Sequence, residues 1–352
     1  MAIKMAIIGM GGMAGWHYKN VKEQVPEIEI TGAYDIRPEA KKTIDDLGLT
    51  NYISPEALYE DKSIDLVLIV TPNDVHKSYS IACMEAGKNV ICEKPVTMNT
   101  PELDEIIAVA NKTGKLFTVH QNRRWDSDYL TVRKIINEGI LNGVYKIESR
   151  VQSSRQFIHG WRDYKINGGG MILDWGIHML DQILDLYPDL KIKSINTHAH
   201  KIVAQEVEDD FTTSLLFENN LSVTINVSMN SFIVQPRWHI FASDGSAKIV
   251  NWDCEGEIVK LADNAELEWG EVIIYTSAGP TRSMAPRPAS TVNKLPLPIV
   301  KGDWLDLHRN VASVLEGKAE PIVTHPQIRR CMQVVDAIFE SAEAGTSVKC
   351  NL

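Results

Sequence analysis

Residues 3–14 have the sequence Ile-Lys-Met-Ala-Ile-Ile-Gly-Met-Gly-Gly-Met-Ala, and this stretch decides the fold. The run Ile3–Gly9 is mainly apolar, which predicts a buried β-strand. The turn that follows has the spacing G-x-G-x-x-A, a form of the dinucleotide-binding fingerprint. Its glycines permit a tight turn and let backbone N–H groups approach a pyrophosphate at the start of a helix. We therefore expect a dinucleotide to contact Gly9, Gly11, Gly12 and Met13.

An acidic residue stands where dinucleotide-binding proteins recognise the adenosine ribose. Asp35 ends the second predicted strand about 20 residues after the glycine motif. Because its carboxylate would bind the ribose diol and repel a 2′-phosphate, we expect NAD in preference to NADP. Arg37 could instead pair with such a phosphate or stack on the adenine. Taken alone, the pattern also fits a glycine-rich turn beside a surface aspartate, or a methyltransferase loop for an adenosyl cofactor.

The first 120 residues alternate short apolar runs with helical patterns. Gly48, Gly87 and Gly114 stand where the intervening helices would end. This alternation predicts an α/β fold with a parallel Rossmann sheet and helices on both faces. The predicted strands are Ile3–Gly9, Ile28–Tyr34, Asp65–Val70, Asn89–Cys92 and Leu116–His120.

From Val144 onward the pattern changes to consecutive strands joined by short loops. Hairpin signals at Asn219–Asn220 and Asp244–Gly245 predict an α+β region with a large, mostly antiparallel sheet. Ala278–Pro298 contains five prolines and is predicted to be a long irregular loop. The predicted strands are Val144–Val151, Ile192–His198, Phe211–Glu218, Leu221–Met229, Trp238–Ala242 and Ala247–Val250. The predicted helices lie near Leu173–Tyr187, at Trp304–Leu315 and at Pro326–Ala344.

Two strands of the predicted parallel sheet end in residues suited to a ligand. Directly after the third and fourth strands come Thr71, Pro72, Asn73, His76, Glu93 and Lys94. Ligands of open α/β sheets bind outside the carboxyl ends of the strands. We therefore expect these residues at the cofactor, with Lys94 close to the nicotinamide.

The sequence Glu93-Lys94-Pro95, together with the fingerprint and Asp35, resembles the glucose–fructose oxidoreductase/inositol dehydrogenase/MocA (Gfo/Idh/MocA) family. The resemblance continues through Gln-Asn-Arg-Arg-Trp-Asp at 121–126, Gly-Trp-Arg at 160–162, and Gly-Gly-Gly-Met-Ile-Leu-Asp-Trp-Gly-Ile-His at 168–178. The Asn-Arg-Arg-Trp-Asp stretch looks most like the scyllo-inositol and sugar dehydrogenase branch. The family implies an NAD-binding Rossmann domain, expected at residues 1–120. A substrate-binding and oligomerisation domain is expected at 121–352, with C-terminal helices that could pack back on the first domain.

The resemblance also implies site residues. Lys94, Asp174 and His178 are the expected catalytic set, and with Arg123 they are expected to bind the substrate. Asn122, Trp161 and Arg162 are expected at the cofactor. The alternative for Arg123 and for the neighbouring Arg124 is a surface salt bridge.

The residues themselves suit the oxidation of an alcohol, which needs a base for the hydroxyl proton and a group that stabilises the alkoxide. Asp174 and His178 are spaced i,i+4 and would share one face of a helix. A neutral His178 could accept the proton, so the rate should rise with pH through an apparent pKa of roughly 6–8. Gly168-Gly169-Gly170 would leave room for cofactor and substrate, although a purely structural Asp/His pair is the alternative.

The predicted function is hydride transfer between NAD and a secondary hydroxyl of a sugar, glycoside or inositol. A reductase of an unrelated carbonyl or imine, and a non-catalytic nucleotide sensor on the same scaffold, are the alternatives. His120, His159, His198 and His200 lack the spacing of metal ligands, and hydride transfer needs no metal, so no metal site is predicted.

Composition limits the class of protein. The 352 residues carry a net charge of −10, which argues against binding nucleic acid or an anionic membrane. No apolar stretch resembles a signal peptide or a membrane span. The five cysteines form no CxxC pair, so a disulfide framework and a structural zinc site are not expected. We expect a cytoplasmic protein that forms a homo-oligomer, a dimer or a tetramer, as similar proteins do.

Overall fold

The computed structural model describes residues 2–263, 265, 273–282 and 287–352. Its N-terminal part is a six-stranded parallel sheet in the order β3-β2-β1-β4-β5-β6. The strands are β1 (Ile3–Ile8), β2 (Ile28–Tyr34), β3 (Thr50–Asn51), β4 (Leu66–Ile69), β5 (Asn89–Cys92) and β6 (Phe117–Val119). The α/β prediction is confirmed, and the five predicted strands are present to within a residue or two at their ends. The sequence analysis missed β3, which is only two residues long.

Helices connect these strands, because neighbouring parallel strands need a crossover connection. They are α1 (Gly12–Gln24), α2 (Ala40–Asp46), α3 (Pro55–Glu60), α4 (His76–Glu85) and α5 (Thr100–Thr113). Strand β4, at the centre of the sheet, is buried at every position, because helices cover both faces of the sheet. The carboxyl ends of β1, β4 and β5 therefore meet at one edge, where the glycine turn, Thr71 and Lys94 follow them.

The second sheet has nine strands in the order β16-β13-β12-β11-β7-β10-β9-β8-β17. Its neighbours are antiparallel except for β7 and β10, which run parallel, so the prediction of a mostly antiparallel sheet is confirmed. The strands are β7 (Val144–Gln152), β8 (Ile192–His200), β9 (Asp210–Phe217), β10 (Ser222–Ser228), β11 (Trp238–Ala242), β12 (Gly245–Ile249), β13 (Gly256–Leu261), β16 (Val292–Leu295) and β17 (Val348–Lys349).

The predicted irregular loop Ala278–Pro298 is wrong in part. Strand β16 lies inside it and pairs with β13, and β15 (Gly279–Arg282) pairs with β14 (Ile273–Thr276) as a separate hairpin. Prolines avoid strand interiors because they lack an N–H donor, but Pro280 sits in the short two-stranded hairpin, where this costs little. Residues 283–286 of this segment lie outside the described residues.

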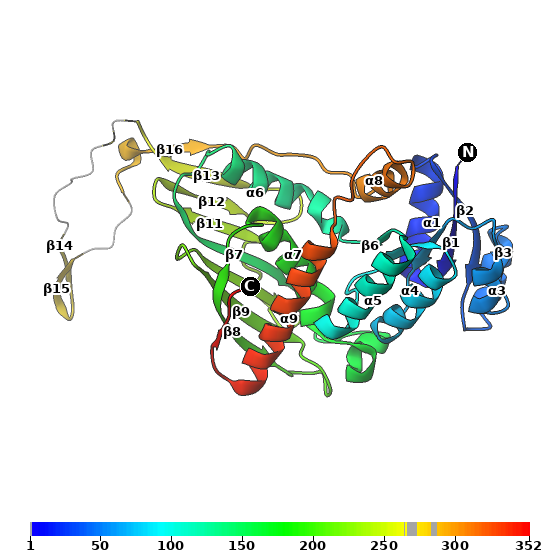
Figure 1. Ribbon diagram of the computed structural model, residues 1–352. Coiled ribbons are helices and arrows are strands. Elements are labelled where there is room, and N and C mark those ends of the chain that lie inside the picture. The colour runs from blue at the N-terminus through cyan, green and yellow to red at the C-terminus, as the bar shows by residue number, and fades with distance from the viewer. Residues whose placement is uncertain (1, 264, 266–272, 283–286) are drawn as a thin grey trace.

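One face of the large sheet is covered by helices. These are α6 (Ser127–Asn137), α7 (Ile177–Leu186) and α9 (His325–Ala344), while α8 (Asp306–Leu315) lies beside α1 (Figure 1). Helix α9 packs on β8 of the large sheet and also on α5, a helix that covers the parallel sheet. Through these contacts, α9 connects the large sheet to the layer of helices on the parallel sheet. No helix in the described ranges has the length and apolarity needed to cross a bilayer.

A buried ion pair joins the turn Asn122–Trp125 to α7. Arg124 is 4% exposed and donates to both carboxylate oxygens of Asp181, at 2.7 and 2.6 Å. The expectation of a surface salt bridge was wrong for Arg124, because α7 and α9 cover it. The pair fixes the turn that carries Asn122 and Arg123 against the helix that carries His178.

Arg124→Met should strongly destabilise the protein, because it leaves the buried Asp181 carboxylate without its cation. The free energy of unfolding should fall by about 3–5 kcal/mol, measured by urea titration. Arg329→Met is the matched control, since Arg329 and its partner Asp104 are 43% and 45% exposed in their side chains. Losing that pair should cost less than about 1 kcal/mol. Equal losses in the two variants would contradict this account.

Candidate active site

Two adjoining cavities lie at the carboxyl edge of the parallel sheet, with volumes of about 400 and 270 Å³. They share the walls formed by Gly11, Val70, Thr71 and Trp161. The larger one contains these residues predicted for the site: Gly11, Gly12, Met13, Thr71, Asn73, Glu93, Lys94, Asn122, Arg123, Trp161, Arg162, Asp174 and His178. The smaller one adds Gly9, Asp35, Arg37 and Pro72. His76 lines neither cavity.

The glycine turn is shaped by its neighbour β4. Gly9 has φ of +95°, and a Cβ atom there would lie 2.5 Å from the carbonyl oxygen of Val70. Only glycine fits this position, because both its conformation and its contact exclude a side chain. Helix α1 begins directly afterwards with Gly11 as its N-cap, so no side chain of that residue occupies the first N–H groups. The turn thus leaves backbone donors free at the cavity.

Asp35 is already saturated with hydrogen bonds. Its carboxylate accepts from the Met10 N–H at 2.6 Å and from the Arg37 backbone N–H, Nε and Nη2 at 2.8, 2.9 and 2.8 Å. Burial alone would raise the pKa of Asp35, but the hydrogen bonds from Arg37 and Met10 outweigh it and lower the pKa. The Arg37 side chain is 50% exposed, so it can turn away from Asp35 toward solvent.

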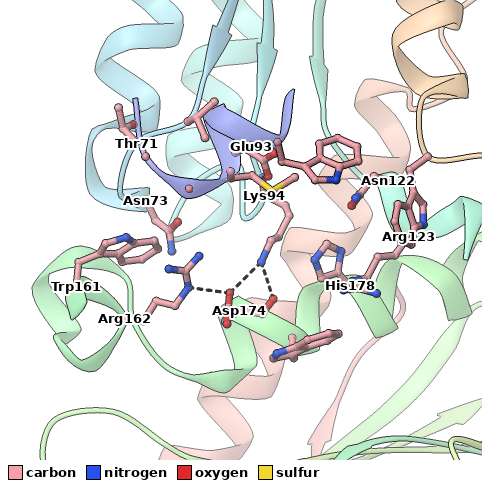
Figure 2. Close-up of a pocket in the computed structure, with 17 residues that line it drawn as sticks. Thr71, Asn73, Glu93, Lys94, Asn122, Arg123, Trp161, Arg162, Asp174 and His178 are labelled. Atoms are coloured by element: carbon pink, nitrogen blue, oxygen red, sulfur yellow. Dashed lines mark hydrogen bonds and ion pairs between the residues drawn. The ribbon is translucent and has the colours of Figure 1, made fainter. Parts of the chain in front are cut away.

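Lys94, which follows β5, contacts Asp174 from the second half of the chain across the larger cavity. Its Nζ donates to the backbone carbonyl and to Oδ1 of Asp174, both at 2.9 Å, and Arg162 Nε donates to the same Oδ1 at 3.1 Å (Figure 2). Burial would raise the pKa of Asp174, but the charges of Lys94 and Arg162 outweigh it and lower the pKa. Asp174 is therefore a carboxylate held between two cations.

Asp174 and His178 are neighbours through an irregular helix. Asp174 lies in a π-helical turn, Ile172–Gly176, and His178 in the first turn of α7. Single π turns inside helices often occur at functional sites, because they redirect side chains. Both residues line the cavity, and the His178 ring lies near the Lys94 ammonium group in Figure 2.

The His178 ring is buried in the wall of the larger cavity. Its Nδ1 is buried and has no hydrogen-bond partner among the described residues. Burial, followed by the positive charges of Lys94 and Arg123, lowers the pKa of His178 well below its usual range. The neutral form therefore dominates near pH 7, which suits a group that accepts a proton.

The Arg123 guanidinium packs against two tryptophans that contact each other, Trp175 and Trp252. Its guanidinium carbon is 4.4 Å from the centre of the Trp175 ring and 5.2 Å from that of Trp252, and it forms an ion pair with Asp126 at 2.9 Å. Stacking and pairing hold a planar guanidinium in one orientation at the cavity wall. Arg123 therefore forms a salt bridge, which was the alternative expected from the sequence, and it also lines the cavity.

The glycines at 168–170 serve the chain itself. A Cβ atom on Gly169 would lie 2.1 Å from the Arg162 carbonyl oxygen, and one on Gly170 would lie 2.4 Å from a Glu208 carboxylate oxygen. The expectation that they leave room for cofactor and substrate is wrong in this respect, since backbone and Glu208 fill the space. They let the Trp161–Arg162 segment pack closely against the start of the Asp174 turn.

Comparison with known proteins identifies the family. Residues 3–121 match the model described as an oxidoreductase family with an NAD-binding Rossmann fold, and residues 129–248 match the GFO/IDH/MocA C-terminal domain. The chain belongs to the Gfo/Idh/MocA oxidoreductase family. The resemblance inferred from the sequence is confirmed, and the chain is an oxidoreductase.

Members of this family with solved structures or assigned activities resemble the chain over much of its length. The structure of an NAD-binding protein from Listeria innocua is 37% identical, covers 99% of each chain and has a TM-score of 0.94. The scyllo-inositol 2-dehydrogenase (NADP(+)) IolW of Bacillus subtilis is 27% identical over 346 residues, 97% of this chain and 94% of that protein. The D-glucoside 3-dehydrogenase of Escherichia coli is 27% identical over 209 residues, 58% of this chain and 59% of that protein.

Sequence reasoning missed several walls of this oxidoreductase's cavities. Trp16 and Trp304 line the larger cavity, and Tyr34, Ile36 and Tyr79 line the smaller one. No local pattern marks them, because large apolar and aromatic residues most often belong to the core. His76 was expected at the cofactor, but it is fully buried, and its ring nitrogens contact the carbonyl oxygens of Pro95 and Thr71 at 2.8 and 2.9 Å. His76 therefore holds the loops that carry Thr71 and Pro95 in place, without lining either cavity.

The ionisation of His178 can be measured directly. Its ring should be neutral throughout pH 6.5–8 and gain a proton only below that range, because burial and two nearby cations lower its pKa. The apparent pKa of roughly 6–8 expected from the sequence concerns the rate of alcohol oxidation, whereas this measurement concerns the His178 ring of the free protein. The measurement is NMR of ¹⁵N-labelled imidazoles, with the His178 signal assigned from its loss in His178→Ala. Arg123→Met should raise the pKa, and a wild-type transition near pH 7 would refute this reasoning.

Proposed function

We propose that this chain is an NAD-dependent dehydrogenase that oxidises a secondary hydroxyl of a sugar, glycoside or inositol, with Lys94, Asp174 and His178 as catalytic residues. The observation that carries the proposal is the Lys94 ammonium group, held by two hydrogen bonds to Asp174 inside a cavity that also contains the glycine turn. A fixed cation and a neutral imidazole beside the glycine turn are what alcohol oxidation requires.

The residues present fit a dinucleotide. Gly9 provides a turn that no side chain can fill, and the N-terminus of α1 faces the cavity with free N–H groups, which suit a pyrophosphate. Asp35 and Arg37 lie at the end of the smaller cavity, where the adenosine ribose would bind. Thr71, Asn73, Glu93, Asn122, Trp161 and Arg162 would surround the nicotinamide half. When bound, the nicotinamide ring accepts or returns the hydride.

Each catalytic residue has one task in this proposal. His178, neutral at working pH, takes the proton of the substrate hydroxyl. The Lys94 cation stabilises the negative charge that develops on the same oxygen, while Asp174 fixes the ammonium group in position. Arg162 completes this arrangement by holding the second side of the Asp174 carboxylate. The carbon–hydrogen bond then breaks as the carbonyl forms, and the reverse sequence reduces a ketone.

A small polyol is the substrate class that the cavity favours. Arg123 and Asn122 offer hydrogen-bond donors, and Trp175 offers a flat apolar face of the kind that packs on a sugar ring. The similar proteins named for inositol and glucoside oxidation support this class. A reductase of an unrelated carbonyl or imine would use the same three residues and is the second candidate. The intact cation and imidazole give no support to a non-catalytic sensor.

We also propose a division into an NAD-binding domain, residues 1–120, and a substrate-binding and oligomerisation domain, residues 121–352. The free, mostly buried cysteines fit a reducing compartment such as the cytoplasm, and a homo-oligomer is what the family resemblance implies. Size-exclusion chromatography with light scattering measures the oligomeric state.

Removing the Lys94 cation should abolish most of the activity. Turnover is measured on a panel of inositols, sugars and glycosides with each cofactor, and Lys94→Met should lower kcat on the best substrate by about 10²–10³-fold. NAD affinity, followed by tryptophan fluorescence, should change by no more than a few-fold. Lys77→Met is the control, since Lys77 pairs with Glu105 on the surface. Turnover near the wild-type level in Lys94→Met would refute the assignment, and turnover only on carbonyls or imines would favour the second candidate.

Cofactor choice should follow from competition at Asp35. We expect NAD to be preferred by about 5–150-fold in kcat/KM, the effect of about 1–3 kcal/mol of charge repulsion against a 2′-phosphate. Asp35→Ser should narrow this ratio. Arg37→Ala should widen it, because it frees Asp35 for the ribose and removes the cation that could bind a phosphate. The similar protein IolW is named for NADP(+), and a preference for NADP that Arg37→Ala reverses would mean that Arg37 outweighs Asp35.

A further inference from the structure

Three histidines from distant parts of the chain meet beneath the active-site cavity. His17 lies on α1, His120 directly follows β6, and His308 lies on α8. All three side chains are fully buried, and one nitrogen of each ring lies within 4.8 Å of those of the other two. His17 and His308 are 291 residues apart in sequence. The arrangement therefore depends entirely on the tertiary fold.

A carboxylate supports this cluster from one side. Glu93 Oε1 lies 2.8 Å from His17 Nε2 and 2.9 Å from His120 Nδ1. The other nitrogen of His17, Nδ1, faces His308 Nε2 at 3.1 Å. A carboxylate that binds one ring nitrogen while the other faces a common point is the usual surrounding of a histidine that ligates a metal.

The cluster also contains polar atoms without partners. Two ring nitrogens, His120 Nε2 and His308 Nδ1, have no hydrogen-bond partner among the described residues, and His120 Nδ1 has only the Glu93 carboxylate at 2.9 Å. Burying an imidazole nitrogen without a partner is unfavourable, because the nitrogen loses its hydrogen bonds to water. This fully buried cluster thus keeps one imidazole nitrogen, His120 Nε2, without a partner among the described residues that a bound metal ion would supply, while His308 would bind the ion through the Nε2 that faces His17.

We propose that His17, His120 and His308 form a site for a divalent transition metal, with Zn²⁺ as the best fit. Tetrahedral zinc with Zn–N bonds of 2.0–2.1 Å separates ligand nitrogens by about 3.4 Å and ring centres by about 5 Å. The ring centres here are 4.5, 5.1 and 5.2 Å apart. The spacing of the three ring centres is thus close to that of a tetrahedral site, and the ligand nitrogens, within 4.8 Å of one another, would close in on the ion when it binds.

The site would connect the glycine-turn helix to the catalytic lysine. His17 lies on the helix that begins at the glycine turn, and Glu93 directly precedes Lys94. A metal would fix α1, α8 and the end of β6 around Glu93, and so hold the backbone that carries Lys94. Trp16 and Trp304 separate the cluster from solvent at the cavity wall, with Trp16 6.3 Å from His120 between ring centres. The metal would position this loop without contacting the substrate.

The experiment is metal binding by the full-length protein after removal of metal with a chelator. Co²⁺ is added and followed by visible absorption, and Zn²⁺ is measured by competition. We expect one metal per chain and the intense visible bands of tetrahedral cobalt. His308→Gln and His120→Gln should each weaken the affinity by at least about 100-fold, the upper end of the loss seen when a supporting residue is removed. His198→Gln, on the exposed side of β8, is the matched control and should bind like the wild type.

X-ray absorption of the zinc-loaded wild type needs no variant and counts the imidazole ligands. Three imidazoles support the proposal, together with a loss of binding in the two cluster variants. A wild-type protein that binds no metal, a spectrum with fewer than three imidazoles, or unchanged affinity in His308→Gln overturns it. In those cases the cluster is a network of neutral, hydrogen-bonded histidines. All these measurements are independent of activity, so they are separate from the test of the proposed function.

Discussion

The contact between Lys94 and Asp174 is the constraint on which the site depends. Lys94 follows a strand of the parallel sheet, and Asp174 belongs to the helix packed on the other sheet, 80 residues away. One ammonium group can satisfy two acceptors of Asp174 only if the edge of the first sheet and the start of α7 are correctly placed. The α5–α9 packing and the buried Arg124–Asp181 pair keep them so.

Features that depend only on neighbouring residues could be predicted from local sequence patterns. The glycine turn, Asp35 and the strands of the parallel sheet follow from spacing and apolar runs, because each is decided within a dozen residues. The two-residue strands β3 and β17 were missed because they carry no periodicity. For the site, resemblance supplied Lys94, Asp174 and His178, and the structure brings them into one cavity.

Other features depend on partners that no sequence window contains. Two adjacent arginines illustrate this: Arg123 packs against Trp175 and Trp252 at the cavity, while Arg124 points away to a buried carboxylate. A pair of like residues in one short turn gives no local sign of which side each will face. The contact of His17 with His308 is the extreme case, since the two residues are 291 positions apart and only the tertiary structure brings them together in the proposed metal site.

Glu93 and Lys94 link the two parts of this site through one peptide. The Glu93 side chain turns inward to two histidines, and the Lys94 side chain turns outward to Asp174. Adjacent residues at the end of a strand point to opposite sides, so an anchor on Glu93 fixes the backbone from which Lys94 extends. A cation that must be placed accurately needs such a support, because the lysine side chain has four rotatable bonds. The buried histidines contact Glu93 on the side opposite to the Lys94 side chain, where they can steady the backbone of the proposed catalytic lysine.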